Sequence, residues 1–108
     1  MSIADFFEGK TGLEVRIRHT SDNEYHNGTY LGADDYYDNT YMFAWRDNGS
    51  IKAVYAILTE IDKVDLSPDI PRIVFHATYC GISILEPGDT FSPFSYEHID
   101  TALKANDQ

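Results

Sequence analysis

A hairpin signature in the middle of the chain constrains the fold more than any other feature. If residues 40–46 and 51–58 are divided with the period of two of a β-strand, both runs carry apolar side chains on each face. The residues between these runs include the pair Asn48-Gly49, which tolerates the left-handed backbone of a tight turn. We therefore predict two adjacent antiparallel strands that are partly covered on both sides. The face expected to point into the core carries Tyr41, Phe43 and Trp45.

More strands are expected on both sides of this hairpin. Residues 13–19 alternate between apolar and charged side chains, which is typical of a half-buried strand. Residues 24–33 form a second expected strand, in which Gly28 and Gly32 allow a strong bend or a bulge. Three later runs favour short strands, the first of them entered through a helical turn: residues 59–66, 72–79 and 81–85.

Short helices are predicted at the two ends of the chain. Residues 2–9 place three apolar side chains on one face of one or two helical turns, and this face is expected to dock on the body of the protein. Residues 95–105 favour a closing helix, which Ser92 or Ser95 could cap. The apolar faces would carry Ile3, Phe6 and Phe7 in the first helix, and Phe94, His98, Ile99, Ala102 and Leu103 in the second.

These elements predict a mainly β, α+β fold in a single domain, because 108 residues is near the commonest domain size. A short N-terminal helix followed by five short strands favours a small, strongly bent β-barrel of the Sm or SH3 type over residues 1–66. Pro68 and Pro71 then break the chain. Residues 67–108 would add a C-terminal strand pair and helix to this barrel. A two-layer α+β sheet is the alternative architecture.

The charge balance limits the classes of partner. The chain has 18 acidic and 8 basic residues, which gives a formal charge of -10. Phosphate contacts need lysine and arginine, so direct binding of nucleic acid is not expected. A basic protein partner, a metal ion, or solubility alone would each account for an acidic surface. Lys10, Arg16 and Arg18 form a small local exception.

Cysteine use and the N-terminal residues indicate a cytoplasmic protein. Cys80 is the single cysteine and has no partner for an internal disulfide, which favours a reducing compartment. The N-terminus carries acids where a secretory signal peptide needs bases. No run approaches the roughly 20 apolar residues of a membrane span, so no membrane partner is expected. The oligomeric state stays open.

A bend rich in acids and tyrosines, at residues 34–41, is the predicted partner-binding surface. Carboxylates accept bidentate bonds from guanidinium groups, and tyrosine rings offer cation–π faces and contact area. The alternative is a solvated turn whose tyrosines pack on the body of the protein. The residues assigned to this surface are Asp34, Asp35, Tyr36, Tyr37, Asp38 and Tyr41, of which the alternation also places Tyr41 on the core face.

Other clusters have weaker chemical signatures. Residues 19–26 hold two histidines and two acids around a turn, but their spacing matches no zinc signature. The acids of residues 34–38 do not follow the pattern of a calcium loop. Cys80 and His76 would be about 13 Å apart along a strand, which is too far for a catalytic hydrogen bond. We therefore expect no catalytic residue, no metal and no cofactor.

The first half of the chain resembles the Sm-like family. The first Sm motif runs from a glycine in the second strand, through a bend with acids, to an asparagine in the third strand. Residues in matching order are Gly28, Gly32, Asp34, Asp35, Tyr37 and either Asp38 or Asn39. The resemblance covers residues 3–66 and implies an Sm-like barrel. The second motif, a basic pair before the last strand, is absent from residues 53–62, so the RNA-binding cation has no candidate.

The acidic charge is similar to that of the Rof type within this family, which binds the termination factor Rho. That resemblance implies a small inhibitor or regulator that docks on a basic, nucleic-acid-binding surface of a larger protein. We therefore expect a small acidic protein-binding module without catalytic activity. The first alternative is an Sm-like oligomer that binds RNA through Lys10, Arg16 and Arg18. A small metal-dependent enzyme is the second alternative.

Overall fold

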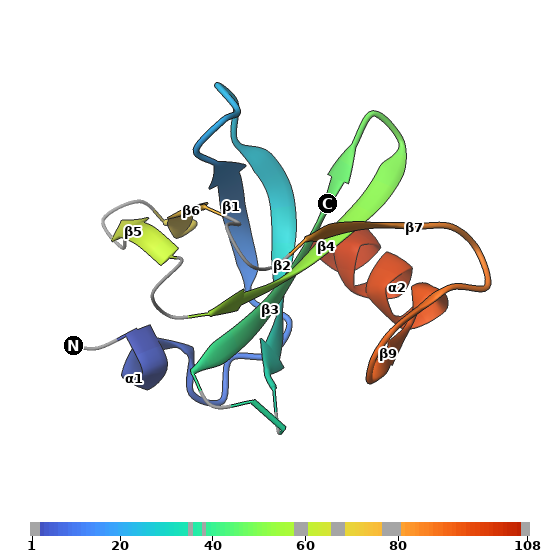
Figure 1. Ribbon diagram of the computed structural model, residues 1–108, viewed down its shortest axis with the longest axis horizontal. Coiled ribbons are helices and arrows are strands. Elements are labelled where there is room, and N and C mark those ends of the chain that lie inside the picture. Colours follow the sequence, from blue (N-terminus) through green and yellow to red (C-terminus); the bar gives the residue numbers. More distant parts are fainter. Residues whose placement is uncertain are drawn as a thin grey trace.

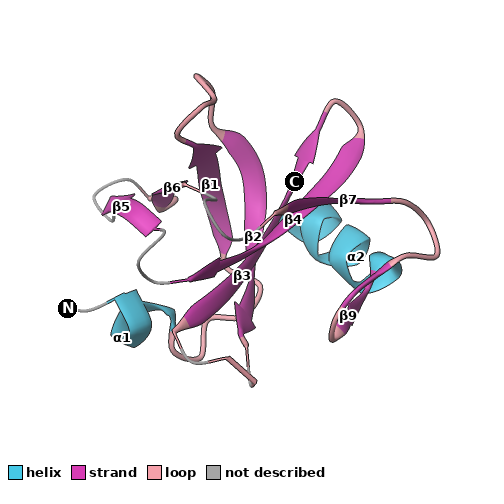
Figure 2. Ribbon diagram, viewed as in Figure 1, coloured by secondary structure: helices cyan, strands magenta, loops and turns pink. Residues whose placement is uncertain are grey.

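The computed structural model of the chain is mainly β. One seven-stranded mixed sheet, one two-stranded hairpin and a helix near each end make up its described part. Figures 1 and 2 show the two helices on opposite sides of the central strands. The mainly β, α+β class expected from the sequence is therefore confirmed. The structure describes residues 3–34, 36–37, 39–57, 61–65, 69–76 and 81–106.

The elements follow one another through short connections. The helices are α1 (Ile3–Phe7) and α2 (Tyr96–Asn106). The strands of the large sheet are β1 (Glu14–His19), β2 (His26–Ala33), β3 (Thr40–Asp47), β4 (Ser50–Ile57), β5 (Ile61–Asp65), β6 (Arg72–Phe75) and β7 (Ile82–Leu85). The small hairpin consists of β8 (Thr90–Phe91) and β9 (Phe94–Ser95). No helix in the described ranges is long and apolar enough to cross a membrane.

The sheet has the strand order β5-β6-β1-β2-β3-β4-β7. Strands β1 to β4 form an antiparallel meander in its centre. β6 lies parallel to β1, with Arg72 opposite Arg16 and Phe75 opposite His19. β5 pairs with β6 and β7 pairs with β4, so these two strands end the sheet within the described residues.

The closed barrel expected over residues 1–66 is not found, because the seven-stranded sheet stays open in the described part of the chain. A five-stranded barrel closes only when the fifth strand pairs with the first. Here β6 pairs with that edge of β1, and β5 pairs with β6 instead. Side-chain alternation reports which faces of a strand are buried, but not which strand lies beside it. The division into residues 1–66 and 67–108 stays a prediction.

β3 is buried on both of its faces. Tyr41, Phe43 and Trp45 point to one side of the sheet, Met42 and Ala44 point to the other, and none of the five is more than 5 % exposed. This confirms the alternation predicted for the strand. Because both faces of β3 are apolar, the protein needs a cover on each side of the sheet, and it therefore has two cores.

The α1-side core contains the aromatic face of β3. Phe7 of α1 is 1 % exposed, and its ring lies 4.5 Å from the ring of Tyr30 and 5.7 Å from that of Phe43. A helix of five residues is marginal by itself, so these aromatic contacts are what hold α1 in place. Burial raises the pKa of Tyr30 to about 12. The other members are Val15, Ile17, Tyr41, Trp45, Val54, Ala56, Ile61, Ile73 and Phe75.

The α2-side core lies on the opposite face of the sheet. Ile99 and Leu103 are four residues apart on one face of α2 and are almost fully buried. The Ser95 hydroxyl oxygen accepts a hydrogen bond from the backbone N–H of His98 at 3.1 Å, which confirms Ser95 as the cap. The remaining members of this core are Leu31, Met42, Ala44, Ile51, Ala53, Leu85 and Phe91.

One segment differs from the sequence-based expectation, and two others include residues that the structure does not describe. The helical turn expected before β5 falls on residues 58–60, outside the described ranges. β6 ends at Phe75, and the last residues of the longer strand expected there, 77–79, are also outside them. The β8–β9 hairpin was not expected, because its residues carry the signals of a helix start. Phe91 anchors this hairpin, since it is 3 % exposed in the α2-side core.

Gly28 of β2 has no room for a side chain. A Cβ atom at this position would lie 2.7 Å from the carbonyl oxygen of Ala44, 3.2 Å from Cβ of Trp45 and 3.3 Å from Cγ2 of Ile17. Gly28 is paired with Trp45, so the missing side chain leaves room for the tryptophan beside β1. Glycine is required here because a side chain would collide with the Ala44 carbonyl oxygen and with Cβ of Trp45. Neither atom can move without a shift of the β3 backbone.

An ion-pair network joins α2 to β3. The Asp100 carboxylate pairs with the guanidinium of Arg46 on β3, and Lys104 Nζ lies 3.0 Å from its second oxygen. The hydrogen bond from Arg46, followed by that from Lys104, holds the pKa of Asp100 below its usual value of 3.8. The network therefore fixes the position of α2 along the sheet, in addition to the apolar contacts of Ile99 and Leu103.

Replacing Gly28 by alanine should destabilise the fold by about 1 to 3 kcal/mol, because the added methyl group has to displace backbone atoms of β3. Urea unfolding followed by Trp45 fluorescence would measure this loss. Gly81→Ala is the matched control, since a Cβ atom there meets nothing within 4 Å. Equal stability of the two variants would contradict the tight packing at Gly28.

Replacing Asp100 by asparagine should lower the stability at pH 7 by up to about 1 kcal/mol, as is found for other partly exposed ion pairs. Because the pKa of Asp100 is lowered in the folded state, its contribution is present above the ordinary value of 3.8 and is lost as the pH falls through the lowered pKa. The difference in melting temperature between wild type and variant should therefore shrink in acid. Asp69→Asn, at an exposed position, is the control that should show no such difference.

Candidate functional site

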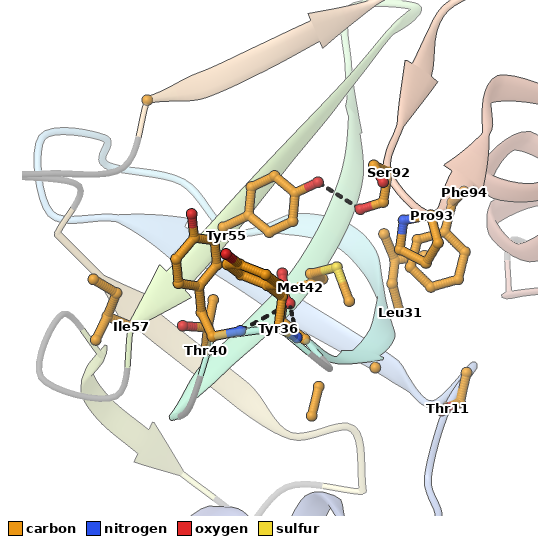
Figure 3. A pocket seen from close by; sticks show the side chains of 15 residues that line it. Thr11, Leu31, Tyr36, Thr40, Met42, Tyr55, Ile57, Ser92, Pro93 and Phe94 are labelled. Atoms are coloured by element: carbon orange, nitrogen blue, oxygen red, sulfur yellow. Dashed lines mark hydrogen bonds between the residues drawn. The ribbon is translucent and has the colours of Figure 1, made fainter.

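A pocket of about 1030 Å³ lies where β2 and β3 meet their connecting bend, on the α2 side of the sheet. Figure 3 shows Tyr36, Tyr55 and Met42 grouped near its centre, with Pro93 and Phe94 beside Leu31. Its walls therefore come from the sheet, from the bend and from the β8–β9 hairpin. The lining residues are Thr11, Leu31, Gly32, Ala33, Asp34, Tyr36, Tyr37, Thr40, Met42, Tyr55, Ile57, Gly81, Ser92, Pro93 and Phe94.

The lining is apolar at its base and acidic at one position. Leu31 and Met42 extend from the α2-side core into the pocket, and the aromatic rings of Tyr55 and Phe94 stand beside them. Among the described residues that line the pocket, Asp34 is the one with a charged side chain. A ligand that combines apolar surface with positive charge is the chemical complement of this lining.

Asp34 organises the bend that leads from β2 to β3. One oxygen of its carboxylate accepts the backbone N–H of Tyr36 at 2.7 Å and that of Tyr37 at 3.1 Å. Its own N–H donates to the carbonyl oxygen of Thr40 at 2.9 Å, which closes the bend. This is the local side-chain-to-backbone bonding that favours aspartate in turns. The carboxylate therefore shapes the bend and also places a negative charge in the pocket wall.

Tyr36 and Tyr37 are the most exposed tyrosines among the described residues, at 84 % and 63 %. Their rings meet edge to face, with centroids 4.8 Å apart. Large aromatic rings left this exposed are unusual on a folded protein and are typical of contact surfaces. The bend thus presents two mostly exposed rings that contact each other.

The structure brings together only some of the residues predicted for the partner surface. Asp34, Tyr36 and Tyr37 all line the pocket. Tyr41 lies on the opposite face of the sheet in the α1-side core and is 5 % exposed, so it offers little contact area to a partner. The other two predicted residues, Asp35 and Asp38, lie outside the described residues.

Tyr55 holds the β8–β9 hairpin against the sheet. Its hydroxyl donates to the carbonyl oxygen of Ser92 at 2.5 Å, as Figure 3 shows, and its ring stacks on Phe91 with centroids 4.1 Å apart. Burial, followed by the negative charge of Asp34, raises the pKa of Tyr55. Tyr55 therefore contributes one hydrogen bond and one aromatic stack to the position of the pocket wall formed by residues 92–94.

The histidine-containing turn between β1 and β2 forms a hydrogen-bond network. The Asp22 carboxylate lies 2.7 Å from His26 Nε2, and this contact is the main reason that the pKa of Asp22 is lowered. His19 bonds instead to the side chain of Ser21 at 2.6 Å. Within the described ranges, no group of three or more histidine, cysteine or acidic side chains is arranged to hold a metal ion.

Lys10 and Arg16, two of the remaining sequence candidates, have different contacts. Lys10 Nζ lies 4.1 Å from the centre of the Phe6 ring, whereas Arg16 lies 3.4 Å from a carboxylate oxygen of Glu14. The large separation expected between Cys80 and His76 is not tested, because Cys80 lies outside the described residues.

Sequence reasoning missed the half of the pocket that comes from residues distant along the chain. The sequence places Tyr55 only in a strand, within residues 51–58, and Phe94 only on the face of the closing helix. No local pattern in the sequence indicates that Tyr55 bonds to Ser92, 37 residues further along the chain. A cluster of exposed tyrosines next to an acid was the one available signal, and it identified one wall of the pocket.

Replacing Tyr55 by phenylalanine should loosen the hairpin wall, because the ring can still stack on Phe91 while the hydrogen bond to Ser92 is lost. A net hydrogen bond of this kind contributes about 1 kcal/mol. Hydrogen exchange read by mass spectrometry should show faster exchange at residues 90–96. Tyr30→Phe, in the other core, is the control, and faster exchange in both variants would contradict the assigned role of the Tyr55 hydroxyl.

No protein-family model, no curated protein and no solved structure matches the chain.

Proposed function

We propose that this protein is a small protein-binding module that docks the pocket and its tyrosine bend on a basic, partly apolar surface of a larger protein. The observation that carries this proposal is the apolar pocket with Asp34 as its charged wall residue and Tyr36 and Tyr37 exposed beside it. Aromatic side chains next to a partly desolvated charge are the usual composition of a binding hot spot.

The size of the pocket supports a protein partner. About 1030 Å³ is at the upper end of the range for drug-sized ligands, and it leaves room for more than one side chain of a partner segment. The two tyrosines extend the contact area beyond the pocket itself, since both are mostly exposed. An aliphatic or aromatic anchor of the partner would fill the apolar base beside Leu31 and Met42.

Charge complementarity supports a basic surface on the partner. The chain carries a formal charge of -10. Among the described residues, the hydrogen bonds that the Asp34 carboxylate accepts use one of its two oxygens, which leaves the other for a guanidinium or ammonium group. Tyr36 and Tyr37 offer ring faces to the same cation. Long-range attraction from the net charge would mainly speed association.

An inhibitory or regulatory role extends this proposal. A module that covers a basic surface competes with any polyanion that uses the same surface, including nucleic acid. The resemblance of residues 3–66 to Sm-like proteins, and of the acidic charge to the Rof type, supports this role. The relation to that family stays a hypothesis.

Two sets of variants separate the charge from the aromatic contacts. Asp34→Asn keeps an oxygen that can accept the N–H groups of Tyr36 and Tyr37 but removes the charge, so partner affinity should fall mainly at low salt. The double variant Tyr36→Ser with Tyr37→Ser should weaken binding by at least about tenfold at any salt, the scale of one hot-spot side chain. The measurement is capture by the immobilised protein from a lysate of the native host, followed by titration of the captured partner.

Asp69→Asn is the control for the loss of one exposed acid, and the melting temperature of each variant checks the fold. Partners lost from the tyrosine variant should be basic proteins. Capture that persists unchanged in both variants, at low and high salt, would overturn the proposal.

A further inference from the structure

A second exposed cluster combines positive charge with an aromatic ring. Arg16 and Arg18 of β1 point to the same face of the sheet, and Arg72 of β6 is the register partner of Arg16. Three of the chain's 8 basic residues are therefore adjacent on two parallel strands. The sequence placed Arg16 beside Arg18, but the parallel pairing that adds Arg72 was not expected.

Tyr25 brings two of these arginines together. The guanidinium carbon of Arg18 lies 5.5 Å from the centre of the Tyr25 ring, and that of Arg72 lies 5.6 Å from it. The ring is 40 % exposed, and Arg72 is exposed as well. A ring contact orients a guanidinium group while leaving its N–H donors available for another bond. We call Arg18, Tyr25 and Arg72 the arginine–tyrosine cluster.

The arginines of this cluster have few acidic contacts among the described residues. Arg18 donates to the backbone carbonyl oxygen of Asp22 at 2.9 Å, whereas the carboxylate of Asp22 bonds to His26. Glu14 lies beside Arg16, outside the cluster. No carboxylate of the described ranges forms an ion pair with Arg18 or Arg72. Asp65 of β5 is the register partner of Arg72, so one acid stands beside the cluster. Two arginines on one tyrosine ring are nevertheless an unusual concentration of positive charge in a chain with a formal charge of -10.

We propose that the arginine–tyrosine cluster binds an acidic peptide segment of a protein, through bidentate hydrogen bonds from Arg18 and Arg72 to its carboxylates. Paired guanidinium forks match the planar geometry of carboxylates and provide two parallel bonds each. The exposed edge of the Tyr25 ring, which is positive in its charge distribution, adds contact area beside the carboxylate.

The overall charge selects a short acidic segment over a nucleic acid. A polyanion that extends beyond the cluster would meet the negative charge of the rest of the chain, and two arginines release too few counterions to offset that repulsion. A short acidic segment contacts only the arginines of the cluster and extends less far over the acidic surface. The same repulsion disfavours a second copy of this chain as the occupant, since both copies are strongly acidic.

The cluster is separate from the pocket. Tyr25 precedes β2 and Asp34 follows its last residue, so the two sites lie at opposite ends of this strand, roughly 25 Å apart. The inference therefore goes beyond the proposed function, and it stands or fails independently of it. A partner with a basic patch and an acidic segment could contact both ends at once, and linked contacts of this kind strengthen one another.

The test uses the full chain and a short fluorescein-labelled peptide of glutamate and serine, with fluorescence anisotropy as the readout. Wild type should bind this peptide and should not bind its glutamine counterpart. Arg72→Gln should weaken binding by about tenfold, and Arg72→Lys by less, because a point charge remains but the bidentate bond is lost. Lys10→Gln removes a cation elsewhere and should leave the affinity unchanged. Asp34→Asn should also leave it unchanged, which keeps this result distinct from the pocket.

Several outcomes would overturn the inference. The glutamate peptide could bind Arg72→Gln as tightly as wild type, or the glutamine peptide could bind equally well. An oligothymidine or inorganic phosphate could bind more tightly than the glutamate peptide, which would assign the cluster to phosphate. A mass in light scattering that rises with protein concentration, and that falls in Arg72→Gln, would assign it to self-association. The melting temperatures of the variants exclude unfolding as the cause of lost binding.

Discussion

The burial of β3 on both faces is the constraint on which the rest of the structure depends. An alternating strand usually keeps one polar face for water, but this strand carries three aromatic rings on one side and Met42 and Ala44 on the other. Truncating one of its large aromatic side chains would cost about 3 to 5 kcal/mol, a large share of a small domain's stability. The two helices are short, and each is placed where it covers one of these faces (Figure 1).

Covering both faces also determines where the pocket lies. α2 and the β8–β9 hairpin cover the α2-side face, and the hairpin is held by Tyr55 and Phe91. Between the hairpin and the bend after β2 the face stays accessible, so apolar side chains such as Leu31 and Met42 line a cavity there. The pocket is thus a part of the second core that the covering elements leave open. The aromatic rings at its edge come from Tyr36 and Tyr37 of the bend, which belong to neither core.

The two candidate surfaces lie at opposite ends of β2 and have opposite charge. At one end the Asp34 carboxylate stands beside two exposed tyrosines, and at the other two arginines contact Tyr25. In both, a tyrosine ring lies beside an ionised group. The ionised group can bind an opposite charge of a partner, and the ring adds contact area. The net charge of -10 favours basic partners at a distance, while the arginine–tyrosine cluster would act only at short range.

The sequence by itself determined the local structure: the strand alternation, the Asn48-Gly49 turn, the Ser95 cap and the aromatic face of β3, because each depends on residues close together in the chain. It also indicated the bend at Asp34, Tyr36 and Tyr37. Only the tertiary structure decided that β6 pairs with β1 and keeps the sheet open, that Tyr55 bonds to Ser92, and that Arg72 joins Arg18 at Tyr25. Contacts of this kind join residues far apart in sequence, and they are selected by the packing of the whole chain, which no local pattern records.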